Sequence, residues 1–150
     1  MVIGFSRRAL GIAALFSGAA LLTTIVAGVS LPLALLLSSA IAGLGAWSIW
    51  ARSSPAARIR LLANLRIGTL AGALATIAYD ATKFALSLPE ASRYNPFEVV
   101  NTFGQLLVGS SASPALISTA GWGFHLINGV TFGVAYCLLF GRRGVVAGIG

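Results

Sequence analysis

Four polar side chains in the second half of the chain are the candidates for chemistry. Asp80 and Lys83 lie in one apolar stretch, and His125 and Asn128 lie in another. Ionisable groups inside long apolar segments are rare and costly in a membrane, and they usually face the interior of a helix bundle. Asp80 and Lys83 are three residues apart, so they can pair on one helix face. Together with the adjacent Tyr79, these residues form the predicted polar cluster.

Two interpretations use the whole cluster. In the first, His125 and Asn128 hydrogen-bond to Tyr79 or Asp80 and fix the order of the helices. In the second, Asp80 and His125 meet across two helices and, with Lys83 and Asn128, form a proton or substrate relay, as in coupled transporters and channels. Such a small protein would then work as a homo-oligomer. The residue types alone leave both interpretations open.

A third interpretation concerns His125 as a cofactor ligand. Gly121 and Gly129 stand four residues before and after it, which leaves a bare helix face where a haem or chlorophyll-type ring would fit. The sequence has no second histidine for bis-histidine haem, so our main expectation is no cofactor. One His, one Cys (Cys137) and three carboxylates at scattered levels predict no metal site. Because no nucleophile–base or paired-carboxylate spacing occurs, we also expect no enzyme activity.

The composition places these residues in an integral membrane protein. Charged residues make up 9% of the chain and hydrophobic residues 57%, whereas a soluble domain carries about a quarter charged residues. The mean hydropathy is +0.92, and no side chain from residue 9 to residue 51 is ionisable. The surface of such a chain could not be held in water. We therefore predict an all-α membrane protein.

Four apolar stretches predict four transmembrane helices in a single antiparallel bundle. Each is close to the ~20 residues that cross the hydrocarbon layer. The predicted spans are residues 9–29, 31–51, 67–88 and 116–140. Pro32 divides the first two. Arg7 and Arg8 before an apolar run resemble a secretory signal, but the run is longer than a usual signal core and another span follows at once. We therefore expect the first span to be retained.

The basic residues predict the orientation. The formal net charge is +7, and most basic residues lie in three clusters beside hydrophobic ends: Arg7 and Arg8, residues 52–66, and Arg142 and Arg143. This placement follows the positive-inside rule. It predicts a protein of the cell inner membrane with both termini cytoplasmic, attracted to lipid headgroups and not to nucleic acid. Residues 52–66 are predicted as a short basic loop, within which residues 56–62 form a helix lying on the inner headgroups.

The connection between the third and fourth spans is predicted to lie outside. Its charged residues are two glutamates and one arginine: Glu90, Arg93 and Glu98. Asn95 and Pro96 are typical of a helix start, with Asn as the cap and Pro in the first turn. We predict a short helix over residues 96–108, half sunk in the outer interface. A re-entrant segment is the alternative.

Small residues predict that the third and fourth spans are neighbours. Each span contains two glycines four residues apart: Gly68, Gly72, Gly129 and Gly133. Small residues let membrane helices approach closely, but eighteen glycines placed at random would give roughly two such pairs. The depth of the polar residues is a second indication. Asp80 and His125 lie at similar distances from the outer ends of their spans, so antiparallel neighbours would bring them level.

These features together predict a non-catalytic structural or accessory subunit of a larger membrane complex. Few charges, small-residue faces and little extramembrane mass favour a protein that works by packing against other subunits or against itself. Residues 144–150 resemble the opening of a fifth span. Either this tail lies at the inner interface or the sequence is part of a longer chain.

Overall fold

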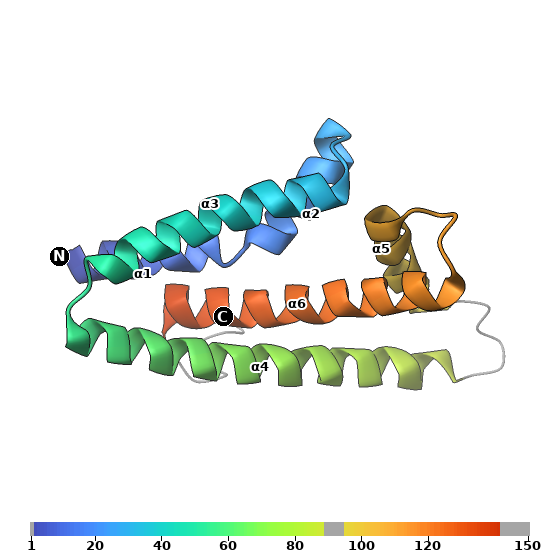
Figure 1. Ribbon diagram of the computed structural model, residues 1–150. Coiled ribbons are helices and arrows are strands. Elements are labelled where there is room, and N and C mark those ends of the chain that lie inside the picture. Colours follow the sequence, from blue (N-terminus) through green and yellow to red (C-terminus); the bar gives the residue numbers. More distant parts are fainter. Residues whose placement is uncertain (1, 89–94, 142–150) are drawn as a thin grey trace.

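The computed structural model describes residues 2–88 and 95–141, and all of its regular elements in these ranges are helices (Figure 1). Their bounds are α1 Val2–Ala13, α2 Phe16–Ala27, α3 Leu31–Ala51, α4 Pro55–Ser87, α5 Glu98–Val108 and α6 Pro114–Phe140. The predicted all-α fold is confirmed. Three helices are long and apolar enough to cross a membrane, or four if the bent pair α1–α2 counts as one span. Residues 90, 93 and 142–150, on which parts of the predicted topology rest, lie outside the described ranges.

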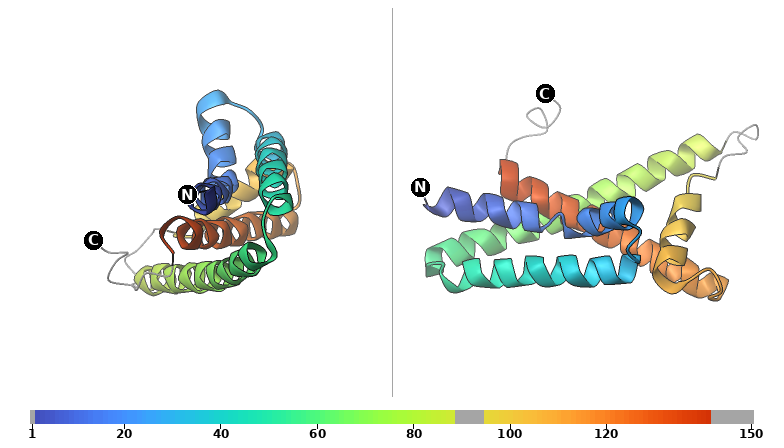
Figure 2. Two further views of the ribbon diagram at one scale, coloured as in Figure 1. Left: turned by 90° about the vertical axis from the view of Figure 1, so that its left-hand side faces the viewer. Right: turned by 90° about the horizontal axis from the view of Figure 1, so that it is seen from above.

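Helices α4 and α6 run in opposite directions, cross each other in the view from above and form the base of the molecule (Figures 1 and 2). Helix α5 packs across the beginning of α6, and α1 packs on its end. Helix α3 packs on α1 and α2 and only touches α5. Helix α6 is therefore the element that the others share, and it carries His125 and Asn128.

The third span differs from its prediction because α4 begins at Pro55 and extends over 33 residues. The predicted basic loop is shorter than expected, since only residues 52–54 form the turn between α3 and α4. Residues 56–62 are helical, as predicted, but they are continuous with the third span as the first turns of α4. Proline is compatible with the first turn of a helix, and the Ser54 hydroxyl caps it by accepting a hydrogen bond from the Ala57 amide at 3.3 Å. At 1.5 Å per residue α4 is about 50 Å long, more than the ~30 Å of a hydrocarbon layer.

The first predicted span is not one straight helix. It breaks between α1 and α2 with a bend of 46°. Before the break, Gly11 lies against the side chain of Leu139 of α6, and just after it Ser17 hydrogen-bonds to Asn128 of α6. Gly18 and Ala20 of α2 still face Phe132 and Phe124 of α6, and after α2 the chain turns back as α3, which packs beside α2 (Figure 1). The bend lets one segment pack on two different helices.

The connection between α4 and α6 contains the predicted short helix, α5, which begins at Glu98. Asn95 does not cap this helix. Its side-chain oxygen accepts a hydrogen bond from the Phe97 amide at 3.0 Å, within the turn that precedes α5. The apolar face of α5 lies on α6, where a Cβ on Gly104 would overlap the carbonyl oxygen of Ile117. The two backbones are therefore in direct contact.

A small apolar core forms where α2, α3 and α6 meet. Ala20, Leu31, Ala34 and Phe124 are buried there, and Phe103 of α5 packs edge-to-face on Phe124 with ring centroids 5.2 Å apart. A second buried group lies at the end of α6, where Leu138 is 2% exposed and Leu10 of α1 is also buried. Many other large apolar side chains point outward along the helices.

Candidate functional site

Asp80 and His125 face each other across α4 and α6. The His125 Nε2 lies 3.0 Å and 3.1 Å from the two carboxylate oxygens of Asp80. A carboxylate only accepts hydrogen bonds, so Nε2 carries the hydrogen and donates it. The side chains are 17% and 20% exposed, for His125 and Asp80 respectively. The edge of the imidazole packs against Trp122, with ring centroids 5.7 Å apart.

The register of this contact is set by the small residues of the two helices. The Cβ that a side chain would add to Gly68 would lie 2.6 Å from the Cα of Val134, and one added to Gly72 would lie 2.7 Å from the carbonyl oxygen of Gly129. A Cβ on Gly129 would overlap the hydroxyl of Thr76. Asp80 lies one helical turn after Thr76 on α4, and His125 lies one turn before Gly129 on α6, so the two side chains meet.

The fourth glycine, Gly133, completes this close packing. A Cβ there would overlap the Cα of Gly72 and the carbonyl oxygen of Gly68. All four predicted packing glycines therefore lie at one continuous contact between α4 and α6. A larger residue at any of the four would push the two backbones apart.

Asn128 does not join Asp80 and His125. Its side-chain oxygen accepts a hydrogen bond of 2.9 Å from the hydroxyl of Ser17 in α2. The Ser17 hydroxyl also lies 2.8 Å from the hydroxyl of Thr131, and Ser17 is fully buried. This polar contact ties α6 to the chain just after the bend of the first span.

Lys83 is also directed elsewhere. Its Nζ donates to the carbonyl oxygen of Pro96 at 3.4 Å and lies 4.6 Å from the centre of the Tyr79 ring. Within residues 2–88 and 95–141 the predicted Asp80–Lys83 pair is not formed, because the Asp80 carboxylate contacts His125 instead. Lys83 lies near the end of α4, where its long side chain reaches outward to the turn before α5.

An open groove of about 490 Å³ borders the Asp80–His125 contact on the α4–α6 surface. The polar residues that line it are Thr76, Tyr79, His125, Asn128 and Tyr136. Its floor is the glycine contact of the two helices. The groove is the place where a small molecule or a chain of water molecules would reach His125.

The helix face beside His125 that the sequence leaves bare is filled in the structure. A Cβ on Gly121 would overlap the carbonyl oxygen of Val100 in α5, and Gly129 faces Thr76 of α4. A flat ring on that face would have to displace both helices. A ring ligated through Nε2 would in addition break the contact with Asp80.

Metal ligands do not gather around His125. Within the described part of the chain, no group of three or more His, Cys, Asp or Glu side chains is placed to hold a metal ion. Cys137 is buried on α6, twelve residues beyond His125, a separation of about 18 Å along the helix. These two residues therefore cannot act as a nucleophile–base pair.

Two contributors to the site, and one contact at the far end of α6, carry no clear signal in the sequence. Ser17 and Thr131 are among many hydroxyl residues in apolar stretches, and only the bend of the first span brings Ser17 to Asn128. Arg7 lies in a predicted flanking cluster, yet its Nη2 donates to the carbonyl oxygen of Cys137 at 3.0 Å. Cationic side chains favour such carbonyls near the end of a helix.

No family model, curated protein or solved structure matches this chain. What the chain does is therefore inferred from its own residues and their arrangement.

Proposed function

We propose that this chain is a multi-pass protein of the cell inner membrane with both termini cytoplasmic. The separation of charge along the bundle supports this placement. Helix α1, the α3–α4 turn and the first twelve residues of α4 carry six arginines, most of them at one end of the molecule (Figure 1): Arg7, Arg8, Arg52, Arg58, Arg60 and Arg66. Asp80, Lys83 and Glu98 lie toward the other end. Such a distribution fits the positive-inside rule.

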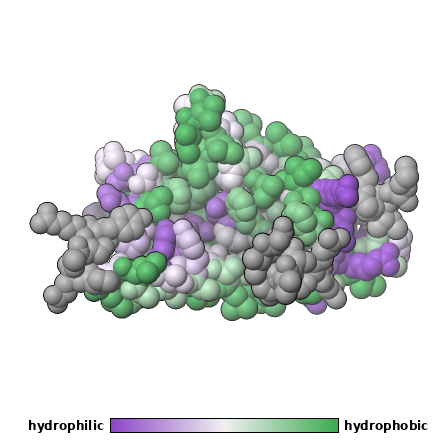
Figure 3. Space-filling view, turned by 180° about the vertical axis from the view of Figure 1, so that it is seen from behind, coloured by the Kyte–Doolittle hydropathy of each residue, from purple (hydrophilic) through white to green (hydrophobic). Residues whose placement is uncertain are grey.

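The outer surface of the helices supports the same placement. Ile41 and Leu44 of α3 and Leu74 of α4 are 72%, 69% and 67% exposed. Figure 3 shows hydrophobic residues over much of one face of the molecule. Apolar surface of this extent suits contact with lipid tails or with other membrane subunits and is unfavourable in water.

Within that membrane, the proposed role is that of a non-catalytic accessory subunit of a larger complex. The observation that carries the proposal is that the predicted polar cluster divides into three contacts between different elements. Asp80 and His125 join α4 to α6, Asn128 joins α6 to α2, and Lys83 joins α4 to the turn before α5. Polar groups in these positions hold helices in place. They do not form one continuous path across the bundle.

A proton or substrate relay is the second candidate, and the groove beside His125 favours it. An imidazole bonded to a carboxylate and reached from an open groove of about 490 Å³ has the parts of a proton-transfer site. In that case the groove would be completed by a second copy of the chain. The contact would then have to open during each transport cycle, which the close glycine packing below it opposes.

Proton flux through purified protein separates these candidates. The protein is reconstituted alone into vesicles that hold a pH-sensitive dye, and an acid pulse is applied outside. For an accessory subunit we expect the same rate of internal acidification as in protein-free vesicles, in both wild type and Asp80→Asn. A flux above that background that disappears in Asp80→Asn would overturn the accessory role in favour of the relay.

A further inference from the structure

A polar pocket of about 380 Å³ lies at the basic end of the molecule, between α1 and the α3–α4 turn. Arg7, Arg52 and Arg60 line it, and three further polar residues complete its wall: Ser53, Ser54 and Asn64. None of the lining residues is acidic. The pocket therefore concentrates positive charge and hydrogen-bond donors without a carboxylate to balance them.

An apolar groove of about 610 Å³ runs along α3 from this end of the molecule. Small residues of α3, namely Ala42, Gly43 and Ala46, line the groove. Its other walls come from α1, α2, α4 and α6. The groove exists because α3 diverges from α4 beyond their shared turn (Figure 1), so the two helices leave a space between them.

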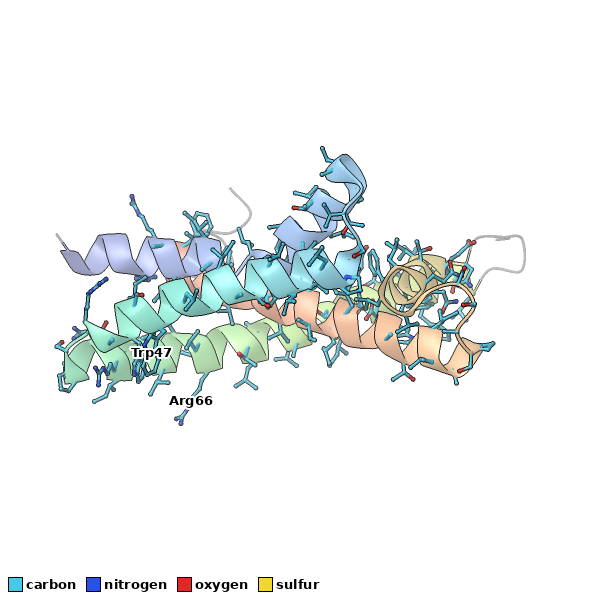
Figure 4. All side chains as sticks on the ribbon, turned by 45° about the horizontal axis from the view of Figure 1, so that its top comes forward. Trp47 and Arg66 are labelled. Carbon is cyan, nitrogen blue, oxygen red and sulfur yellow. The ribbon has the colours of Figure 1, made fainter. Side chains whose placement is uncertain are left out.

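The pocket and the groove adjoin each other. Leu10 of α1 and Leu61 of α4 line both of them. Trp47 and Trp50 line the groove at its basic end, and Figure 4 shows Trp47 between α3 and α4. Tryptophan favours the level of the headgroups in a membrane. A molecule with an anionic head and an apolar tail would therefore fit across the junction.

Further contacts hold this region in shape. The Nε of Arg58 donates to the carbonyl oxygen of Trp50 at 3.1 Å, and its guanidinium lies 5.3 Å from the centre of the Trp50 ring. Arg7 is fixed by its bond to the carbonyl oxygen of Cys137. Arg52 and Arg60 are exposed and free to turn toward a bound group. The walls of the pocket are thus held in place, while the guanidinium groups of Arg52 and Arg60 can turn toward a ligand.

We infer that the pocket and groove together bind an anionic phospholipid, with the phosphate among Arg7, Arg52 and Arg60 and an acyl chain along α3. Guanidinium groups match phosphate oxygens in charge and geometry. A zwitterionic lipid fits less well because its ammonium group would find no carboxylate in the pocket. This inference goes beyond the accessory role, and the site can be tested with protein in detergent micelles.

The test measures lipid bound to the full-length protein by native mass spectrometry during titration with phosphatidylglycerol. We expect Arg52→Gln and Arg60→Gln each to weaken binding about fivefold, the effect of one basic residue near an anionic lipid. Arg66→Gln is the matched control, because Arg66 is also on α4 but points away from the bundle (Figure 4) and does not line the pocket. It should leave binding unchanged. An equal loss in Arg66→Gln would overturn the site and show an effect of net charge alone.

The groove is tested separately with two glycines of α3. A Cβ on Gly43 or on Gly45 would meet nothing within 4 Å, and only Gly43 lines the groove. Gly43→Leu should therefore abolish the bound lipid while Gly45→Leu retains it. Binding of phosphatidylcholine as strong as that of phosphatidylglycerol would contradict an anionic phospholipid site. So would displacement of the lipid by inorganic phosphate, if Gly43→Leu had no effect on binding. Either result would leave the proposed accessory role intact.

Discussion

At the scale of single residues, the partners of the polar groups decide what those groups do. His125 donates to Asp80 at the α4–α6 contact, while Asn128, three residues along the same helix, bonds to Ser17 on α2. Hydrogen bonds between membrane helices stabilise the fold by modest amounts, so each contact orients the two helices as well as stabilising them. A set of such contacts to different helices specifies which helix lies next to which.

The Asp80–His125 contact should be measurable as a coupling energy. In a double-mutant cycle of Asp80→Ala and His125→Ala, we expect the two changes to be non-additive by about 1 kcal/mol in the free energy of unfolding. The matched cycle of Asp80→Ala and Asn128→Ala should be additive, because Asn128 bonds to α2. Both are measured by denaturation in mixed micelles. Additivity in the first cycle would show that the contact does not stabilise the fold.

At the scale of helices, the four glycines set the distance and the register of α4 and α6. Their effect is local, since Gly123 of the same helix α6 has no neighbour within 4 Å. A Cβ on Gly133 would overlap the Cα of Gly72, whereas one on Gly123 would meet nothing within 4 Å. Gly123 is therefore a matched control for Gly133 in a test of the close contact between α4 and α6.

We expect Gly133→Ala to lower the free energy of unfolding by about 1–3 kcal/mol, as overpacking of a close contact does. Gly123→Ala should leave it unchanged or raise it by up to about 1 kcal/mol, because alanine favours helix more than glycine. Denaturation in micelles reports both values. Equal effects of the two substitutions would mean that α4 and α6 are not in close contact at Gly133.

The sequence predicts some of these helix features and misses others for physical reasons. The sequence predicts that Asp80 and His125 lie at the same depth in the bundle. The rise per residue of a helix is constant, so each residue's distance from the end of its span can be counted. The start of α4 was missed because arginines and Pro55 are typical of a loop, although both also suit the exposed first turns of a long helix. The break after α1 has no local signal, since it arises from contacts to α6 and α3 made far along the chain.

At the scale of the whole molecule, charge and apolar surface give the proposed orientation. The arginine-rich end is proposed to face the cytoplasm, and the α5–α6 turn is proposed to face the opposite side. Ala56 and Ser110 are exposed at these two ends. Because Cys137 is the one cysteine of the chain and is buried, its replacement by alanine gives a background for labelling.

In that background, Ser110→Cys should react with a membrane-impermeant maleimide added to intact spheroplasts. Ala56→Cys should react only after the membrane is permeabilised, since the basic end lies inside. After permeabilisation both cysteines should be labelled with the same intensity, which shows that each is accessible to the reagent. Labelling of both positions from one side would require an even number of crossings between them and would overturn the proposed topology.

The accessory role is tested most directly by the composition of the particle that contains this chain. The protein is extracted from its own membrane in mild detergent, and the intact particle is weighed by native mass spectrometry. We predict a mass that requires different polypeptides in fixed ratio to this chain, with the same composition for Asp80→Asn. A particle made of this chain alone, together with loss of transport in Asp80→Asn, would contradict the accessory role.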